Sequence, residues 1–299
     1  MLIDLHTHST ASDGTEAPAE VVASAARAGV DVLALTDHDT TAGWDEAGVA
    51  AARLGVALVR GTEVSAQHRG SSLHVLSYLQ DPTAPALLRE MELARDSRET
   101  RARRMVELIA VDHPITWEDV LAQTVAGTTI GRPHIADALV AAGHFPDRSA
   151  AFTDVLRSGG RYHVHHYAPS AVDAVLAIRE SGGVPVFAHP GAEVKGPVVD
   201  DAVIRAMADA GLAGLEVFHR DHSDAQRARL HGLADELGLF VTGSSDYHGT
   251  GKPNLLGRTP RRPPSWRRSR STGPCPCSAE GRRWTSRPCS TSGSSPRSS

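Results

Sequence analysis

Residues 18–38 read PAEVVASAARAGVDVLALTDH, and this stretch contains one complete unit of the expected fold. Pro18 predicts the start of a helix and Gly29 its end, because helices favour proline in the first turn and glycine just beyond the last. The apolar run VLALT that follows is typical of a buried strand, and it ends at Asp37 and His38. The stretch thus predicts a helix, a turn and a strand whose carboxyl end carries polar side chains.

The same alternation recurs through residues 1–258. The predicted helices span 18–28, 44–54, 171–180, 199–210 and 224–237, and the predicted strands span 2–5, 32–36, 56–59, 73–79, 184–188, 214–218 and 239–242. Strands separated by helices of about 10–15 residues are typical of βαβ units and of a mainly parallel sheet. The sequence therefore predicts an α/β fold with seven strands, in which a closed sheet is favoured over an open one.

Long helical runs replace this alternation between residues 81 and 166. They span 84–110, 117–124 behind the candidate N-cap Thr116, and 133–142 before Gly143. We interpret residues 81–166 as a helical insertion, and residues 1–80 together with 167–258 as the barrel. Parallel barrels carry their active sites at the carboxyl ends of the strands, so the chemistry is expected there.

The tail, residues 259–299, differs in composition from everything before it. It contains nine Arg, 11 Ser, seven Pro and all three cysteines, but no Leu, Ile, Val, Phe or Met. Such a segment cannot bury apolar surface, and we expect it to be disordered. The abrupt change near Thr259 favours a frameshifted or otherwise aberrant terminus. A basic arm for nucleic acid and a C-x-C metal or redox site are the alternatives.

Charge and hydropathy exclude several classes of function. The formal charge is −4 for the whole chain and −12 for residues 1–258, which argues against a long nucleic-acid track. The sequence has no run of about 18 apolar residues, and the polar residues Asp4, His6 and His8 lie where a secretory signal would have an apolar region. We therefore expect a soluble cytoplasmic protein that does not contact membranes. The oligomeric state is not predicted, and a monomer is compatible with the sequence.

Each predicted strand carries a metal-competent side chain within it or just after it. In strand order these are His6 and His8, Asp37 and His38, Glu63, His74, His189, His219, and Asp246 with His248. So many imidazoles and carboxylates on one face would repel one another or lack partners unless cations lay between them. Nitrogen and oxygen ligands without thiolate favour Mn²⁺, Fe²⁺ or Zn²⁺. Neighbouring ions of this kind catalyse phosphoester hydrolysis, so this is the predicted reaction class.

Four motifs, taken in order, resemble the PHP (polymerase and histidinol phosphatase) superfamily. They are DLHTHS at 4–9 with SDG at 12–14, TDHD at 36–39, AHPG at 188–191 and SDYHG at 245–249. The resemblance covers nearly all of residues 1–258 and implies a distorted seven-stranded (β/α)7 barrel with a trinuclear metal centre. GRPHIA at 131–136 resembles the stand-alone 3′,5′-nucleotide bisphosphate phosphatases, some relatives of which also trim short RNA from its 5′ end.

The resemblance also implies how three divalent ions would be held; Mn²⁺ is expected, with Fe²⁺ or Zn²⁺ as alternatives. The ligands would be His6, His8, Glu63 and Asp246 for the first ion, Glu63, His74 and His189 for the second, and Asp13, His38 and His248 for the third. Glu63 would bridge the first two ions. Asp4 and Asp37 would accept hydrogen bonds from the ligating imidazoles and orient them.

Three further residues look like the phosphate-binding and leaving-group residues of the family. They are Arg132 and His134 in the insertion, and His219 after the sixth strand. The planar guanidinium of an arginine binds two phosphate oxygens at once, although a solvated Arg132 at the start of a helix is the alternative. Ala192 departs from the family pattern, which commonly has arginine after His-Pro-Gly, and Lys195 is the candidate to replace that contact.

The sequence thus predicts a metal-dependent phosphatase. The expected reaction removes the 3′-phosphate from 3′,5′-bisphosphorylated nucleotides such as pAp, with activity on short oligoribonucleotides as an extension. A histidinol-phosphate-type phosphatase or a DNA-repair exonuclease with the same metal centre is the first alternative. An inactive barrel that serves as a binding module is the second, and the complete set of family ligand positions disfavours it.

We predict that truncation after Arg258 leaves the metal content and phosphatase activity unchanged. The tail has no branched aliphatic side chain to offset the backbone entropy lost on ordering, roughly 1–2 kcal/mol per residue. Limited proteolysis followed by mass spectrometry should place the first cleavages beyond residue 258. A protease-resistant tail, or a truncated protein without activity, would favour the basic-arm interpretation instead.

Overall fold

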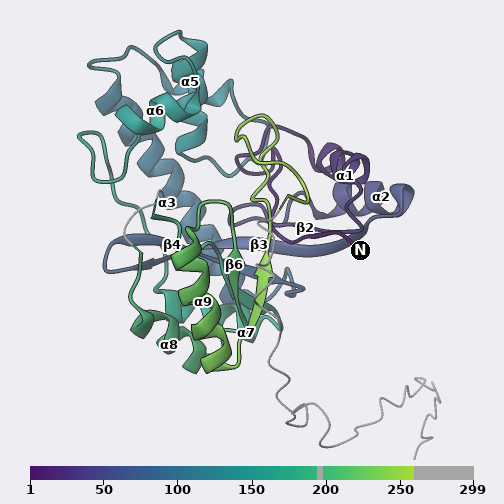
Figure 1. The fold of residues 1–299 in the computed structure, drawn as a ribbon. Coiled ribbons are helices and arrows are strands. Elements are labelled where there is room, and N and C mark those ends of the chain that lie inside the picture. Colours follow the sequence, from purple (N-terminus) through teal and green to yellow (C-terminus); the bar gives the residue numbers. More distant parts are fainter. Residues whose placement is uncertain (194–197, 259–299) are drawn as a thin grey trace, which may run out of the picture. The chain divides into compact units, whose positions relative to one another are not determined.

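The computed structural model describes residues 1–193 and 198–258, whose strands form one sheet in sequence order (Figure 1). Its seven described strands are β1 (Ile3–Asp4), β2 (Val32–Leu35), β3 (Ala57–His68), β4 (Ser71–Tyr78), β5 (Val184–Phe187), β6 (Gly214–Phe218) and β7 (Phe240–Gly243). Beyond their ends, the first and last strands meet. His8 N–H donates to Tyr247 C=O at 2.8 Å, and Thr7 forms a parallel bridge with Tyr247. The sheet therefore curls into a nearly closed barrel, which confirms the predicted α/β barrel class.

The sheet is mainly parallel, as predicted, and β4 is the exception. Strand β4 runs antiparallel to both β3 and β5, whereas the other neighbouring pairs are parallel. The cause is a two-residue turn at Arg69 and Gly70, whose φ angles of 49° and 81° suit a tight hairpin. Strand β3 is consequently much longer than the predicted 56–59, and Glu63 lies inside it instead of after it.

The helices agree closely with the sequence expectation. Those around the barrel are α1 (Pro18–Arg27), α2 (Trp44–Leu54), α7 (Ala171–Glu180), α8 (Asp201–Asp209) and α9 (Asp224–Leu237); those within residues 81–166 are α3 (Pro85–Ile109), α4 (Trp117–Leu121), α5 (Arg132–Ala141) and α6 (Arg148–Asp154). Helix α6 was not predicted, because it has only seven residues; the Asp147 side chain caps it by accepting from Ala150 N–H at 2.9 Å. Figure 1 shows α5 and α6 grouped away from α7, α8 and α9.

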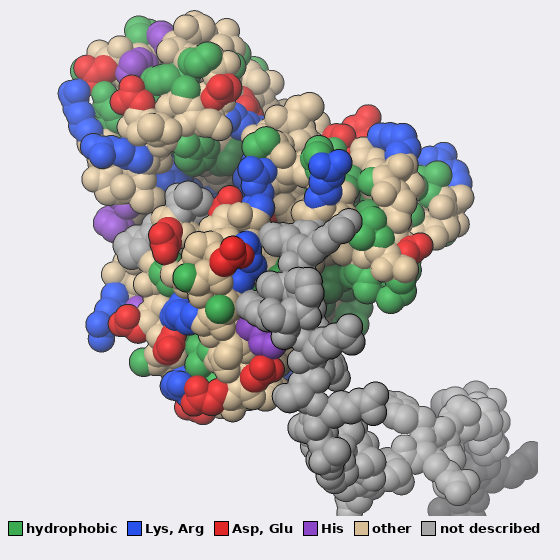
Figure 2. Space-filling view, viewed as in Figure 1, with side chains coloured by type: hydrophobic (Ala, Val, Ile, Leu, Met, Phe, Trp, Pro, Cys, Tyr) green, Lys and Arg blue, Asp and Glu red, His purple; other side chains and the backbone are tan. Residues whose placement is uncertain are grey.

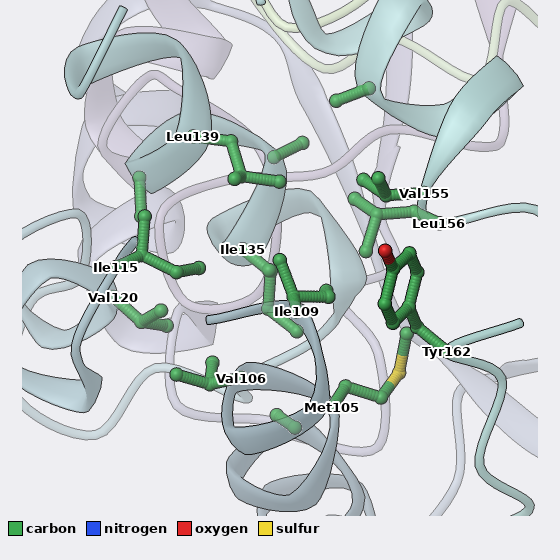
Figure 3. Packing of buried hydrophobic residues seen from close by; sticks show 14 residues of the cluster. Met105, Val106, Ile109, Ile115, Val120, Ile135, Leu139, Val155, Leu156 and Tyr162 are labelled. Atoms are coloured by element: carbon green, nitrogen blue, oxygen red, sulfur yellow. The ribbon is translucent and has the colours of Figure 1, made fainter. Parts of the chain in front are cut away.

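Residues 81–166 contain a hydrophobic core of their own (Figure 3). Apolar side chains from α3, α4, α5 and α6 and the segments between them meet there; the labelled ones are Met105, Val106, Ile109, Ile115, Val120, Ile135, Leu139, Val155, Leu156 and Tyr162. Helices α5 and α6 are thereby fixed against α3, which in turn contacts β3 of the barrel. This core sets the position of the polar side chains that the insertion directs toward the barrel.

Two predictions fall outside the described residues. They concern the tail, residues 259–299, and Lys195, which belongs to the undescribed segment 194–197. Within the described part of the chain, no helix combines the length and the apolar character needed to cross a bilayer.

We expect Ile109→Ala to destabilise the protein by about 2–5 kcal/mol, the cost of removing a large aliphatic side chain from a packed core. Ile109 is fully buried, whereas the exposed fraction of Val111, two residues further on, is 76%. Val111→Ala is therefore the matched control and should change the free energy of unfolding by less than about 0.5 kcal/mol. Urea titrations followed by circular dichroism measure both, and equal effects would contradict the core described here.

Candidate metal centre and phosphate-binding cavity

The fold gathers all nine predicted metal ligands into one cluster. They are His6, His8, Asp13, His38, Glu63, His74, His189, Asp246 and His248. Centroids of neighbouring imidazole rings in the cluster lie 4.1–5.7 Å apart. Four sets of three residues offer ligand atoms that all lie within 4.8 Å of one another. Strand ends that are far apart in the sequence therefore converge, as the barrel geometry predicts.

Glu63 lies at the centre of this cluster and touches imidazoles with both carboxylate oxygens. Its Oε1 is 2.9 Å from His74 Nδ1 and 3.0 Å from His189 Nε2. Its Oε2 is 3.2 Å from the Nε2 atoms of both His6 and His8, and 3.3 Å from His38 Nδ1. Each oxygen thus faces a different set of imidazoles, which is the arrangement expected of a carboxylate between two cations.

Asp13, His38 and His248 form a neighbouring group. Asp13 Oδ1 is 3.2 Å from His248 Nε2, and Asp13 Oδ2 is 3.7 Å from His38 Nε2. His8 connects this group to Glu63, because its two ring nitrogens lie 3.6 Å from Asp13 and 3.2 Å from Glu63. The three predicted ligand sets are therefore parts of one continuous cluster.

Asp246 joins the cluster to two groups at its edge. Its Oδ1 lies 3.6 Å from His6 Nε2 and 3.5 Å from His8 Nε2. Its Oδ2 lies 3.0 Å from Lys252 Nζ and 3.5 Å from His219 Nε2. The sequence analysis did not identify Lys252. This residue lies in a loop, and only the folded structure shows that its ammonium group pairs with Asp246.

Two carboxylates of the cluster, those of Glu63 and Asp13, have a lowered pKa. Burial by itself would raise the pKa of Glu63 and Asp13, but the surrounding imidazoles outweigh it and lower both pKa values well below the ordinary range. The pKa values of two imidazoles in the cluster shift in opposite directions. Burial would lower the pKa of His8, but hydrogen bonds to Asp246 and Glu63 raise it to about 9, whereas burial and then Lys252 lower the pKa of His248 to about 4.

Several ring nitrogens in the cluster lack a hydrogen-bond partner among the described residues. These buried atoms are His38 Nδ1, His74 Nδ1, His219 Nε2 and His248 Nε2; carboxylate oxygens lie near them, but outside the directions in which the rings can hydrogen-bond. Buried polar atoms without partners are costly. The donor set of imidazoles and carboxylates therefore fits divalent cations such as Mn²⁺, Fe²⁺ or Zn²⁺.

Two of the candidate ligands have strained backbones. His189 has a φ of 33° and Asp246 a φ of 54°, in the left-handed region that residues other than glycine rarely adopt. Each such conformation costs about 1–3 kcal/mol and persists only where the surroundings enforce it. Here His189 N–H donates to Glu216 at 2.7 Å, and Asp246 C=O accepts from Asn254 Nδ2 at 2.7 Å.

Glu216, on β6, is a buried residue of the site that sequence reasoning missed. Its Oε1 lies 3.1 Å from His6 Nδ1 and also accepts from the Ser244 hydroxyl, while its Oε2 accepts from His189 N–H. The carboxylate therefore orients one candidate ligand ring and the backbone of another. A single acid inside the apolar run GLEVF was the available signal.

The orienting role predicted for Asp4 and Asp37 differs from the contacts that the structure gives them. Asp4 accepts backbone N–H groups of Ser245 at 3.0 Å and Gly257 at 2.8 Å, so it fixes the chain on either side of the last motif. Asp37 accepts from Ser9 N–H at 2.8 Å and from the Ser12 hydroxyl at 2.6 Å. Both acids hold loops that carry ligands, whereas Glu216 contacts an imidazole directly.

A cavity of about 710 Å³ opens between the cluster and residues of α3, α5 and α6. Arg98, Arg101 and Arg132 line it, together with His166, Phe152 and Ala192. Arg132 Nη1 donates to Leu156 C=O at 3.0 Å and to the Ser158 hydroxyl at 3.1 Å, so the guanidinium is held in place and is not simply solvated.

Neither Arg101 nor Arg132 forms an ion pair with a carboxylate in the described part of the chain, whereas Arg98 pairs with Asp39 at 3.0 Å. Burial, followed by repulsion from Arg98, lowers the pKa of both guanidinium groups. Arg101 Nε is also buried without a hydrogen-bond partner. An anion in the cavity would satisfy these groups.

His134 and His219 are not among the described residues that line the cavity. His134 is buried, and both of its ring nitrogens bind backbone: Nδ1 accepts from Gly131 N–H at 3.0 Å and Nε2 lies 3.0 Å from Ser12 C=O. These contacts do not support the predicted phosphate-binding or leaving-group role of His134. His219 is buried beside Asp246, and its Nδ1 accepts from Asp221 N–H at 3.2 Å, which leaves its proton on Nε2.

Several known proteins with similar sequences are phosphoesterases, as the cluster of imidazoles and carboxylates suggests. A PHP domain profile matches residues 4–122. The 3′,5′-nucleoside bisphosphate phosphatase of Chromobacterium violaceum is 36% identical, over 88% of this chain and 93% of that protein. The phosphoribosyl 1,2-cyclic phosphate 1,2-diphosphodiesterase of Eggerthella lenta is 37% identical, over 83% and 95%. The 5′-3′ exoribonuclease of Haemophilus influenzae is 33% identical, over 82% and 89%.

A solved structure agrees as well. A protein of Bifidobacterium adolescentis, described as a metal-dependent phosphoesterase, superposes with a TM-score of 0.84 and 45% identity, over 86% of this chain and 91% of that one. The described barrel, the strand-end cluster and these relationships lead to one conclusion. The chain belongs to the PHP family.

Proposed function

We propose that this protein is a metal-dependent phosphoesterase that removes the 3′-phosphate from small 3′,5′-bisphosphorylated nucleotides such as pAp. One observation carries the proposal: a single cavity is lined both by the carboxylate and imidazole cluster and by the guanidinium groups of Arg101 and Arg132, which form no ion pair with a carboxylate among the described residues. A molecule with two phosphates a few ångströms apart would satisfy both. The related 3′,5′-nucleoside bisphosphate phosphatase supports the same substrate class.

The cluster would hold three divalent cations, with the ligand sets given by the family resemblance. Glu63 suits the position between two ions because its two oxygens face different sets of imidazoles. Bound there, such ions lower the pKa of a shared water and stabilise charge that develops on the phosphoryl oxygens. We propose Mn²⁺ as the native ion.

The chain's own residues would bind and orient the substrate. Arg101 and Arg132 would hold the phosphate that does not react, since buried guanidinium groups bind phosphate oxygens in a fixed geometry. Phe152, whose ring lies 5.5 Å from the Arg132 guanidinium carbon, would offer an apolar surface beside them. His219 keeps a proton on Nε2 next to Asp246 and is not among the described residues that line the cavity, so it would act on the site through Asp246.

Activity on short oligoribonucleotides is a second candidate, supported by the related 5′-3′ exoribonuclease. The cavity volume of about 710 Å³ is in the range of small-molecule sites, roughly 300–1,000 Å³. Among the described side chains that Figure 2 shows, acidic and basic groups are interspersed. These features favour a mononucleotide over a long polymer. A comparison of kcat/KM for pAp and for a 5′-phosphorylated tetranucleotide distinguishes the two candidates.

We predict that the folded protein binds two to three equivalents of transition metal and that Glu63→Gln lowers this number more than any other single ligand change. The substitution would remove a negative charge from the surroundings of two ions together. Elemental analysis after gel filtration measures the content, with Glu107→Gln as the control because Glu107 is exposed and pairs only with Arg104 in the described structure. Less than one equivalent in the unaltered, folded protein would refute the proposed metal centre.

We predict that Arg132→Ala raises KM for pAp by an amount equivalent to roughly 2–5 kcal/mol, the scale for losing one partner of a buried charge pair. Hydrolysis of an aryl phosphate, which has only the reacting phosphate, should change much less. Arg104→Ala is the matched control, because Arg104 is exposed on α3 and makes an ion pair on the surface. Equal losses on both substrates would mean that Arg132 serves the fold or the chemistry instead of recognition.

A further inference from the structure

Four consecutive backbone carbonyls of residues 10–13 accept hydrogen bonds from the insertion. Thr10 C=O accepts from the Thr128 hydroxyl at 2.8 Å, and Ala11 C=O accepts from Thr129 N–H at 2.9 Å. The remaining two are bound by side chains: His134 Nε2 lies 3.0 Å from Ser12 C=O, and Arg148 Nη1 donates to Asp13 C=O at 3.1 Å. We call these four contacts the loop clamp.

The hydrogen bonds of His134 place its ring proton where it can be donated to Ser12 C=O. Its Nδ1 accepts from Gly131 N–H, so the ring proton must lie on Nε2, the atom that faces Ser12 C=O. Burial lowers the pKa of His134, which keeps the ring neutral and preserves this arrangement of donor and acceptor. Both nitrogens of the imidazole are thus committed to backbone atoms.

The guanidinium group of Arg148 is likewise held by hydrogen bonds from three of its nitrogen atoms. Its Nε and Nη2 bind the carboxylate of Asp137 on α5, which leaves Nη1 directed at Asp13 C=O. The guanidinium also fills the space beside Gly251, where any added Cβ would collide with it. Arg148 therefore joins α5, α6 and the loop that carries a candidate metal ligand.

Asp13 depends on this loop for its position, because residues 10–13 form a turn outside any helix or strand. From the barrel side, the Ser12 hydroxyl donates to Asp37 at 2.6 Å, and Ser12 N–H donates to Ser9 C=O at 3.1 Å. The outward carbonyls of the turn have the insertion as their partner. Without it, the loop would regain backbone freedom, and Asp13 would no longer be held in one position.

We propose that the loop clamp holds Asp13 in place for the third metal ion, and that His134 and Arg148 are positioning residues which set the affinity of that ion. The proposal rests on the proposed function, because it takes Asp13, His38 and His248 to be the ligands of one ion. Arg132 opens the helix that carries His134, so phosphate binding and the retention of this ion involve the same element, α5.

The test is a calorimetric titration of metal-free protein with Mn²⁺, together with the metal content after gel filtration. His134→Ala should lower the affinity for one of the three ions by about 10–100-fold, which is the usual loss when a partner outside the ligand shell is removed. The affinities for the other two ions should not change. His144→Ala is the matched control. His144 Nε2 lies 2.9 Å from Pro114 C=O, so it makes the same kind of contact in the insertion without touching residues 10–13.

A double-mutant cycle separates positioning from general destabilisation. Once Asp13→Asn has removed the ligand itself, adding His134→Ala should cause no further loss of Mn²⁺ affinity, whereas additive losses would overturn the proposal. Thr128→Val and Arg148→Lys act on the same loop through milder changes, and they serve if His134→Ala does not fold. His134→Gln, which keeps a donor, should recover part of the affinity.

The possible failures are distinguishable. Three ions of unchanged affinity in His134→Ala would overturn the loop clamp and leave the metal centre standing. Only two ions in the unaltered protein would refute the third site, and the clamp proposal with it, whereas less than one equivalent would refute the metal centre as a whole.

Discussion

The burial of Glu63 among imidazoles is the constraint on which the rest of the site depends. A carboxylate without exposure to water is stable only if positive or hydrogen-bonding partners surround it. Here His74 and His189 face one oxygen, and His6, His8 and His38 face the other. These five partners come from four separate parts of the barrel, so the cluster exists only when the sheet has closed. Folding and assembly of the site are therefore one event.

The barrel supports this cluster through backbone contacts as much as through side chains. Glu216 holds His6 by its ring and His189 by its N–H, and Asp4 holds the backbone of Ser245, next to Asp246. The left-handed conformations of His189 and Asp246 are maintained by such contacts. The free energy gained from the surrounding hydrogen bonds offsets the backbone strain of these two candidate ligands, which would not adopt such conformations alone.

Much of this arrangement could be predicted from the sequence, because the carboxyl ends of strands converge in any barrel. That rule alone predicts that His6, His38 and His189 lie close together. Three features escaped it for physical reasons. The reversal of β4 depends on the turn at Arg69, the partners of Glu216 are distant in sequence, and His134 lies in a motif that favours a catalytic role although both of its ring nitrogens bind backbone. Contacts of this kind are decided by packing in three dimensions, which no local pattern encodes.

The two chain connections of the insertion have a consequence for how such enzymes can diverge. Residues 81–166 leave the barrel after β4 and return before α7, so a different helical segment could in principle be exchanged there and bring a new substrate preference. The carbonyls of Thr10 to Asp13 limit that freedom, because a replacement must supply donors at the same four places. If Arg132 binds the substrate and Asp13 a metal ion, as proposed, an exchange of residues 81–166 would affect both, and this segment is less modular than its separate hydrophobic core suggests.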